Sequence, residues 1–80
     1  MDEIRNRLTK CFRIVFPSLP ESQIPMARQE SVPEWDSVAG ITLLNVLEDE
    51  FQLEMDLELA GELDSYERIC EHLGPLVNGS

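Results

Sequence analysis

Residues 34–51 read EWDSVAGITLLNVLEDEF, a strongly apolar run with polar signals at both ends. The run predicts a helix over residues 37–51, and a helix this apolar usually sits at the centre of a bundle. Its apolar arc consists of Ile41, Leu43, Leu44, Leu47 and Phe51. Asp36 and Ser37 head the helix, and three consecutive acids end it. The first question is whether Ser37 is only a helix cap or a reactive hydroxyl that a partner can reach.

The sequence before this run predicts one helix and a long loop. Residues 2–16 carry a single apolar stripe at helical spacing, formed by Ile4, Leu8, Cys11, Phe12 and Val15. Residues 17–36 contain four prolines and several polar residues, which predict a loop. A loop of this length in a small domain is functional or pinned by its own side chains. We expect the pins to be Ile24, Met26 and Val32.

The sequence after the run predicts a short helical turn and a third long helix. The turn falls in LELAGEL, within the connection formed by residues 52–63. The long helix is expected over residues 65–73, with Asp64 as its cap. Gly74-Pro75 is expected to end it. Its apolar stripe consists of Tyr66, Ile69, Cys70 and Leu73.

The expected fold is all-α. It is a small four-helix bundle of three longer helices and one short helix, with the long loop between helices 1 and 2. The 80 residues make a single domain, 1–80, and a chain of this size buries only about 60% of its unfolded surface. Residues 1–3 and 76–80 are expected to fray. No stretch alternates like a strand, and no internal repeat is found.

The charge of the chain favours protein partners over nucleic acid. The formal net charge is −10, and a nucleic-acid surface needs a basic face to neutralise phosphates. Residues 1–29 hold five bases and three acids, whereas residues 30–80 hold thirteen acids and one base. Residues 30–80 therefore produce a strong negative electrostatic field, which suits association with basic surfaces on other proteins.

The expected location is cytoplasmic. No run approaches the roughly 20 apolar residues that a membrane helix needs, so no membrane contact is predicted. The first residues are charged and lack the apolar core of a signal peptide. Cys11 and Cys70 have no close metal or redox spacing, and are expected to be reduced structural thiols.

Ser37 is well placed to bear a phosphodiester. A helix start presents free N–H groups and partial positive charge, which suit a phosphate. A simple cap formed by Asp36 or Ser37 explains the same pair, and for an arbitrary Asp-Ser it is the better explanation. The chain offers its own comparison, because Asp64-Ser65 also precedes a predicted helix and is typical of an ordinary cap.

Two features of the predicted helix 37–51 oppose its local stability. The acids at its C-terminal end, Glu48, Asp49 and Glu50, are each unfavourable by about 0.3–1 kcal/mol. Gly40 costs roughly 1 kcal/mol relative to alanine. Both features make sense if partners recognise this helix. The alternative is that acids are spread over an acidic protein and that Gly40 permits close helix packing.

Residues 56–67, DLELAGELDSYE, come close to a calcium-binding loop. Asp56, Gly61 and Glu67 stand at its positions 1, 6 and 12, but Ala60 occupies a ligand position. The alternative function is therefore an acidic helical protein-binding or calcium-binding module that uses this loop. No specific metal site and no catalytic residue are predicted, because His72 is the only histidine and no nucleophile–base set surrounds Ser37.

Residues 34–73 resemble an acyl carrier protein. Asp36-Ser37-Val38 resembles the Asp-Ser-Leu attachment motif of that family. LEDEFQLEMD, residues 47–56, resembles the family's acidic helix end and the alternating apolar residues after it. The expected helix lengths and the long loop agree over the whole chain. Motif, fifteen-residue helix, acidic end and connection together make the resemblance fairly specific.

The resemblance implies that Ser37 carries 4′-phosphopantetheine, donated from coenzyme A by a phosphopantetheinyl transferase. The thiol of this arm would hold acyl intermediates as thioesters. Acyl-loading and acyl-processing enzymes of a fatty-acid, polyketide or other specialised pathway would use them. Asp36 would be the flanking acid, near the metal of the transferase. Such a carrier is not itself an enzyme and is expected to be a monomer.

The resemblance also implies roles for other residues. Val38, Glu48 and Asp49 would help form the face that basic docking patches of partner enzymes read. The core and any acyl pocket would be lined by Ile41, Leu47, Leu63 and Ile69.

The sequence departs from the family at several positions. Ala39 and Thr42 stand where fatty-acid carriers usually have acids, and Asn45 stands where an apolar residue is usual. Val38 replaces the commoner leucine, and the Gly-Gly of peptidyl carrier domains is absent before the serine. The chain therefore resembles a stand-alone carrier that serves one specialised pathway.

Overall fold

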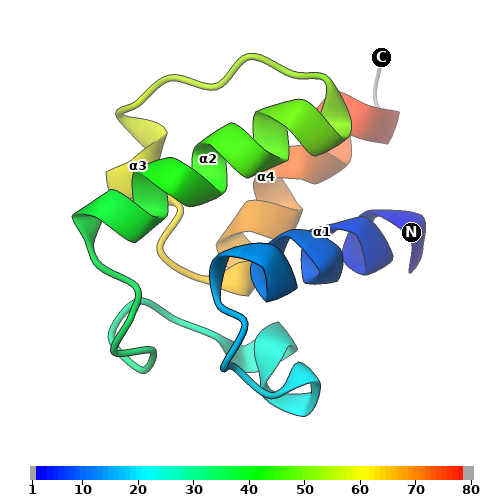
Figure 1. Ribbon diagram of the computed structural model, residues 1–80. Coiled ribbons are helices and arrows are strands. Elements are labelled where there is room, and N and C mark those ends of the chain that lie inside the picture. Colours follow the sequence, from blue (N-terminus) through cyan, green and yellow to red (C-terminus); the bar gives the residue numbers. More distant parts are fainter. Residues whose placement is uncertain (1, 79–80) are drawn as a thin grey trace.

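The computed structural model describes residues 2–78, and these residues are mostly helical (Figure 1). Within them there is no strand, and the single isolated bridge joins Arg28 to Ser65. The all-α prediction is therefore confirmed. The elements in chain order are α1 (Asp2–Val15), the 3₁₀ helix η1 (Glu21–Met26), α2 (Ser37–Phe51), α3 (Leu59–Glu62) and α4 (Tyr66–Asn78).

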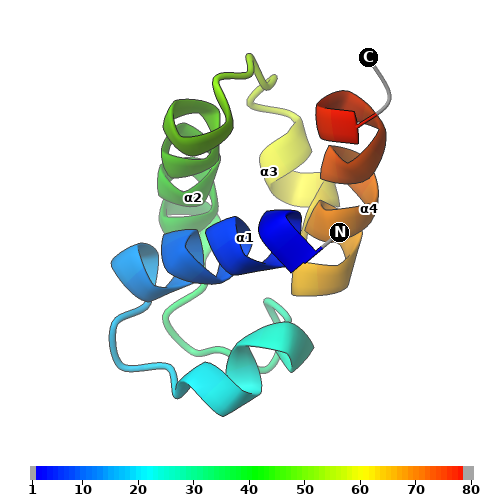
Figure 2. The same cartoon turned by 90° about the vertical axis from the view of Figure 1, so that its right-hand side faces the viewer.

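The long helices are arranged around α1. In Figure 2, α2 and α4 rise on either side, α1 crosses in front of both, and η1 lies below α1. α1 packs against α2, α4 and η1, and the short α3 packs against α2. The first residues of α2 lie at the left of Figure 1, at the end of α2 farthest from the start of α1 and the end of α4.

An aromatic cluster fills the space between these elements. The ring of Phe12 packs edge-on against Trp35 and against Tyr66, with ring centroids 5.4 Å apart in each case. Phe16 lies 5.8 Å from Phe12 and 5.4 Å from Trp35, also between centroids. Contacts of this kind add about 0.5–1.5 kcal/mol to the burial of the rings. The cluster therefore joins α1, the end of the long loop and α4.

The predicted apolar stripe of α1 is confirmed. Its first four members are buried and Val15 is half-buried. Burial raises the pKa of the Cys11 thiol to about 11, and burial also raises the pKa of Cys70. Both cysteines are free thiols, and a raised pKa keeps them in the less reactive protonated form.

The long loop is more ordered than the sequence predicts. Residues 21–26 form η1, which the proline-rich pattern did not indicate. Ile24 and Val32 are buried and pin the loop, as expected. The prediction for Met26 is wrong, because its side chain is 70% exposed. Three residues make one 3₁₀ turn, so Ile24 and the buried Ala27 share the inward side and Met26 points away.

The second predicted helix is confirmed at both ends. α2 begins at Ser37 and ends at Phe51, and Gln52 terminates it in a left-handed conformation with φ 56° and ψ 49°. The N–H of Gln52 donates to the carbonyl of Glu48, and its side-chain amide donates to the carbonyl of Asp49 at 2.8 Å. These bonds satisfy carbonyls that a helix end otherwise leaves free.

The third long helix is longer than predicted. α4 continues to Asn78 with Pro75 inside it, so the predicted end at Gly74-Pro75 is wrong. Gly74 keeps a negative φ and so does not terminate the helix. Val77, one turn further, packs against the core, which favours continuation. Residues 2, 3 and 76–78, expected to fray, lie in helices, whereas residues 1, 79 and 80 lie outside the described residues.

Arg7 ties α1 to the C-terminal end of α2. Its Nε lies 2.9 Å from a carboxylate oxygen of Glu50, and another guanidinium nitrogen donates to the backbone carbonyl of Glu50. The guanidinium also lies over the ring of Phe51, 4.6 Å from its centroid. Lys10 approaches Glu50 at 3.5 Å. A cation at this helix end complements the macrodipole and stabilises the contact between α1 and α2.

No helix within residues 2–78 has both the length and the apolar character needed to cross a membrane.

The ion pair predicts a pH-dependent contribution to stability. The hydrogen bond from Arg7 holds the pKa of Glu50 below its ordinary value of 4.5, and Lys10 adds to this effect. The stabilisation is therefore present above pH 4.5 and is lost as the pH falls through the lower folded-state pKa. We expect Glu50→Gln to lower the free energy of unfolding at pH 7, with the deficit shrinking below pH 4.5.

Denaturant unfolding at a series of pH values measures this deficit. The matched control is Asp49→Asn, because Asp49 is the exposed neighbour and forms no ion pair within the described residues. A deficit for Glu50→Gln that is as large at pH 3 as at pH 7 would contradict the assignment.

Candidate functional site

The start of α2 leaves the Ser37 hydroxyl accessible. Asp36 is the N-cap, and its Oδ1 accepts a hydrogen bond from the backbone N–H of Ala39 at 2.8 Å. Ser37 is the first residue of the helix, and its side chain is exposed. Within residues 2–78 we find no hydrogen bond to its hydroxyl. The question of cap or reactive group is therefore answered in part, because the capping role belongs to Asp36.

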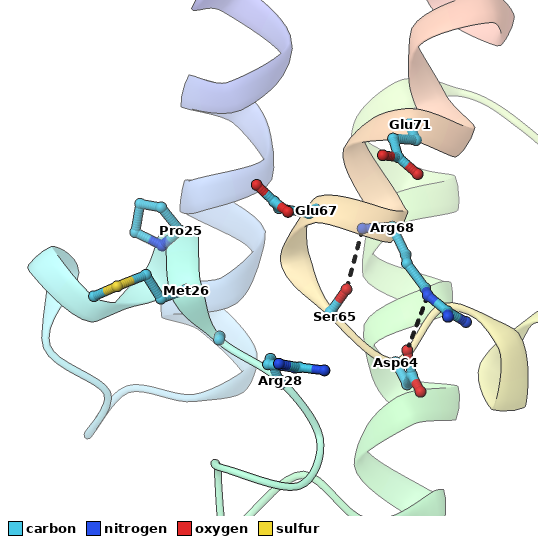
Figure 3. Close-up of a pocket in the computed structure, with 9 residues that line it drawn as sticks. Pro25, Met26, Arg28, Asp64, Ser65, Glu67, Arg68 and Glu71 are labelled. Atoms are coloured by element: carbon cyan, nitrogen blue, oxygen red, sulfur yellow. Dashed lines mark hydrogen bonds and ion pairs between the residues drawn. The ribbon is translucent and has the colours of Figure 1, made fainter.

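The Asp64-Ser65 pair is arranged differently (Figure 3). Here the serine is the cap, since Ser65 Oγ accepts a hydrogen bond from the backbone N–H of Arg68 at 3.2 Å. Asp64 instead forms an ion pair with Arg68 at 3.6 Å, so the prediction that Asp64 caps this helix is wrong. The backbone carbonyl of Asp64 accepts from Gln29 N–H at 2.8 Å. Of the two serines, only Ser37 is both exposed and free of the capping role.

The surface beside Ser37 is apolar. Val38 is 72% exposed and Ile41, three residues later, is 38% exposed. The prediction that Ile41 belongs to the core is therefore wrong. Residues 38 and 41 share the outward face of α2, while Leu43, Leu44 and Leu47 occupy its inward face. Leu63 and Ile69 are buried with Leu47, as expected for core residues.

The acidic end of α2 is mostly engaged by the protein itself. Glu48 is half-buried, and its Oε2 accepts from the backbone N–H of Met55 at 2.8 Å, which holds the connection that follows the helix. Glu50 pairs with Arg7 and Lys10. Asp49 is the exposed member of the three. Two of the three acids therefore stabilise the fold, so their position at this end does not by itself indicate recognition by partners.

Two unexplained features meet near the start of α2. Trp35 is 3% exposed, and its Nε1 is the one buried side-chain polar atom without a hydrogen-bond partner within residues 2–78. A buried donor in this state costs about 1–3 kcal/mol. A Cβ added to Gly40 would lie 3.7 Å from that nitrogen and 3.6 Å from the carbonyl oxygen of Ala60. These are ordinary contact distances, so close packing does not require glycine here. The sequence already indicates Gly40 as unfavourable in a helix, whereas it gives no sign of the unpaired nitrogen beyond Trp35 being the only tryptophan.

Residues 56–67 do not adopt a single twelve-residue loop. They include α3 and the start of α4, which is capped by Ser65. Asp64, at position 9 of the predicted loop, is occupied by its pair with Arg68. Within residues 2–78 no group of three or more candidate ligand side chains comes together. The calcium-binding alternative therefore gains no support.

A surface hollow of about 520 Å³ lies between η1 and the start of α4, and no residue of α2 lines it (Figure 3). Its wall mixes charges of both signs, with Arg28 and Arg68 against Asp64, Glu67 and Glu71. Asp64 and Glu67 of the predicted calcium-binding loop line it, but none of the residues that the carrier resemblance singles out does. The start of α2 is therefore the better candidate site.

Comparison with models of known protein families, with curated proteins and with solved structures found no match to this chain.

The role of Glu48 can be separated from that of Asp49 by two substitutions. We expect Glu48→Ala to lower the free energy of unfolding by about 1–2 kcal/mol, because it removes a charged acceptor from the Met55 N–H. Asp49→Ala should change it by less than about 0.5 kcal/mol, because its side chain is exposed. Urea unfolding measures both values. Equal effects would show that Glu48 is not the structural member of the pair.

Gly40→Ala should stabilise the protein. The new methyl group meets no atom closer than 3.6 Å and improves helix propensity, so the free energy of unfolding should rise by about 0.5–1 kcal/mol. Gly74→Ala is the comparison variant, since a Cβ there meets nothing within 4 Å apart from its chain neighbours, and Pro75 directly after it should make the gain smaller. Thermal and urea unfolding measure both variants. A loss of stability confined to Gly40→Ala would show that the fold requires glycine at this position.

Proposed function

We propose that this chain is an acyl carrier protein whose Ser37 bears 4′-phosphopantetheine. The observation that carries the proposal is that Asp36 and Ser37 have different roles at the start of α2. Asp36 caps the helix through the Ala39 N–H, and the adjacent Ser37 hydroxyl stays exposed. A serine that only capped the helix would have its hydroxyl engaged, as Ser65 has.

The chemistry proposed for Ser37 is a phosphoryl transfer. Its Oγ attacks the phosphorus of coenzyme A that carries the pantetheine, and a new P–O bond forms. The P–O bond to adenosine 3′,5′-bisphosphate breaks, and a base of the transferase takes the serine proton. The backbone N–H groups of Ser37 and Val38 lie in the first turn of α2, where a helix leaves donors free for a phosphate. Asp36 would face the metal of the transferase.

The proposal includes the finer architecture that the resemblance implies. In it, α1, α2 and α4 are the longer helices of a four-helix bundle and α3 is the short one. Ser37 stands at the junction of the long loop and α2. The arm then extends from the apolar surface of Val38 and Ile41, and its thiol carries an acyl group as a thioester.

Partner enzymes are proposed to dock on exposed residues of α2. Val38 and Asp49 are the predicted recognition residues whose side chains are exposed. Basic patches would suit Asp49 and the net charge of −10. We propose a monomer in the cytoplasm, and the free thiols of Cys11 and Cys70 support a reducing compartment.

Intact-mass spectrometry tests the proposal directly. Incubation of the protein with coenzyme A and a broad-specificity transferase should add one phosphopantetheine group. Ser37→Ala should abolish the addition, because no other hydroxyl occupies the first position of α2.

Ser65→Ala is the matched control. It removes the other serine of an Asp-Ser pair and should lower stability by about 1 kcal/mol through loss of the α4 cap, yet it should be modified in full. Failure of the wild-type chain with several competent transferases would overturn the proposed function, as would unchanged modification of Ser37→Ala.

A further inference from the structure

The outer stripe of α2 consists of its exposed residues nearest to Ser37, namely Val38, Ile41, Thr42 and Asn45. We infer that this stripe selects a transferase whose facing surface is uncharged, and rejects a transferase that carries a basic patch there. The inference rests on the proposed function and names the chemistry of the partner that acts at the same site. Thr42 and Asn45 determine the specificity through the charge that they lack.

The first observation is a stretch of sequence without charge. Residues 37–47 hold no acidic or basic side chain, and this is the longest such run in a chain of which 28% is charged. Burial does not explain the run, because the outer stripe belongs to it and is exposed. The members of the stripe are three or four residues apart, so they share one face of the helix. An exposed helix face usually carries charged side chains.

Helix stability does not favour the residues of the stripe either. Valine, isoleucine, threonine and asparagine are weaker helix formers than glutamate, lysine or arginine. Strong helix formers suit exposed positions, where packing does not decide the residue. The exposed side of α4 follows this rule with Glu67, Arg68 and Glu71. The outer stripe is therefore exceptional within the molecule, and it lies on the helix that begins with Ser37.

The stripe offers apolar and neutral contacts only. Val38 is 72% exposed and presents the largest apolar area of the four. The Thr42 hydroxyl donates to the backbone carbonyl of Val38 at 3.0 Å, so its own helix already satisfies it. Asn45 carries a neutral donor and a neutral acceptor. A fitting partner surface is therefore apolar beside Ser37 and uncharged opposite Asn45.

A transferase has to cover this stripe. Its active site must reach the Ser37 hydroxyl, so its footprint is centred near the start of α2. A standard interface covers about 800 Å² on each partner, which corresponds to a disc of about 16 Å radius. At about 1.5 Å per residue, Asn45 lies about 12 Å along the helix from Ser37, and Asp49 lies about 18 Å away. Asn45 therefore falls inside the footprint, whereas Asp49 falls at its edge.

The absence of charge discriminates between transferases. A lysine or arginine that faced the stripe would lose its water without gaining a carboxylate, which is unfavourable. On the line of α2, Asp36 precedes the stripe and Asp49 is the first exposed charge beyond it. Glu58 and Glu62 belong to the segment around α3 and not to the stripe. Cations of a fitting partner therefore lie at the ends of the stripe and not over its middle.

The experiment measures kcat/KM for two transferases on the same carrier. One transferase docks on its own carrier through a basic patch, and the other docks through an uncharged apolar surface. Intact mass follows the modification, and the ratio of the two values is compared between the wild type and its variants. Because both enzymes act on the same protein, a change in the folded fraction cancels in the ratio.

Asn45→Asp is the decisive variant. It should shift the ratio at least about tenfold toward the basic-patch transferase. The new carboxylate faces a cation in one complex and is desolvated without a partner in the other. Thr42→Asp, three residues closer to Ser37, should shift the ratio in the same direction. In the wild type the ratio should favour the transferase with the uncharged surface.

Asn6→Asp is the matched control. It makes the same isosteric change at an exposed position in the first half of α1, whose start is far from the start of α2 (Figure 1). The net charge becomes equal to that of Asn45→Asp, but the new carboxylate does not lie on the stripe. The ratio should therefore stay within about twofold of the wild type, because only the long-range field changes.

Two results would overturn the inference: an equal shift of the ratio in Asn45→Asp and Asn6→Asp, or faster modification of the wild type by the basic-patch transferase. Both leave the proposed function intact, because mass is still added at Ser37. If neither transferase adds mass, the proposed function fails and the inference fails with it.

Discussion

The packing of Phe12 against three other aromatic rings is the interaction on which the rest of the fold depends. It holds Trp35, at the end of the long loop, and Tyr66, at the start of α4, against the same face of α1. The packing therefore holds Trp35 in place just before α2 and Tyr66 in place as the first residue of α4. Because Trp35 is buried in this cluster, the chain that follows it has to leave the core at Asp36. The cluster thus determines where α2 begins.

The same constraint explains why the two Asp-Ser pairs behave differently. In the first pair the anchored aromatic residue, Trp35, comes before the aspartate, and the aspartate becomes the cap. In the second, Tyr66 comes after the serine and already belongs to α4, with its N–H donating to the carbonyl of Ala27 at 3.0 Å. The serine is then the last residue before the helix and has to cap it. The position of the buried aromatic residue therefore determines whether the aspartate or the serine caps the helix.

Local patterns predicted the elements, and contacts distant in sequence decided the details. The bounds of α2 and the apolar stripe of α1 follow from periodicity and capping, so the sequence was sufficient for them. Glu50 is different, because its partner Arg7 lies 43 positions away and no local pattern reveals the pair. Gly74-Pro75 usually ends a helix, but packing of Val77 outweighs that tendency. At the candidate site, Ser37 was predictable from its motif, whereas the unpaired nitrogen of Trp35 depends on which groups surround it after folding.

The features of α2 that the fold does not explain consequently lie at its beginning and not at its acidic end. An unfavourable local feature indicates function only while the fold gives no reason for it. Glu48 and Glu50 have such reasons, since one holds the following connection and the other binds α1. Gly40 and the Trp35 nitrogen have none, and they lie together beside the exposed Ser37. Selection for stability alone would favour alanine at position 40 and a ring without a polar atom at position 35. Gly40 and the unpaired Trp35 nitrogen, both destabilising, therefore lie at the same end of α2 as the exposed Ser37 hydroxyl.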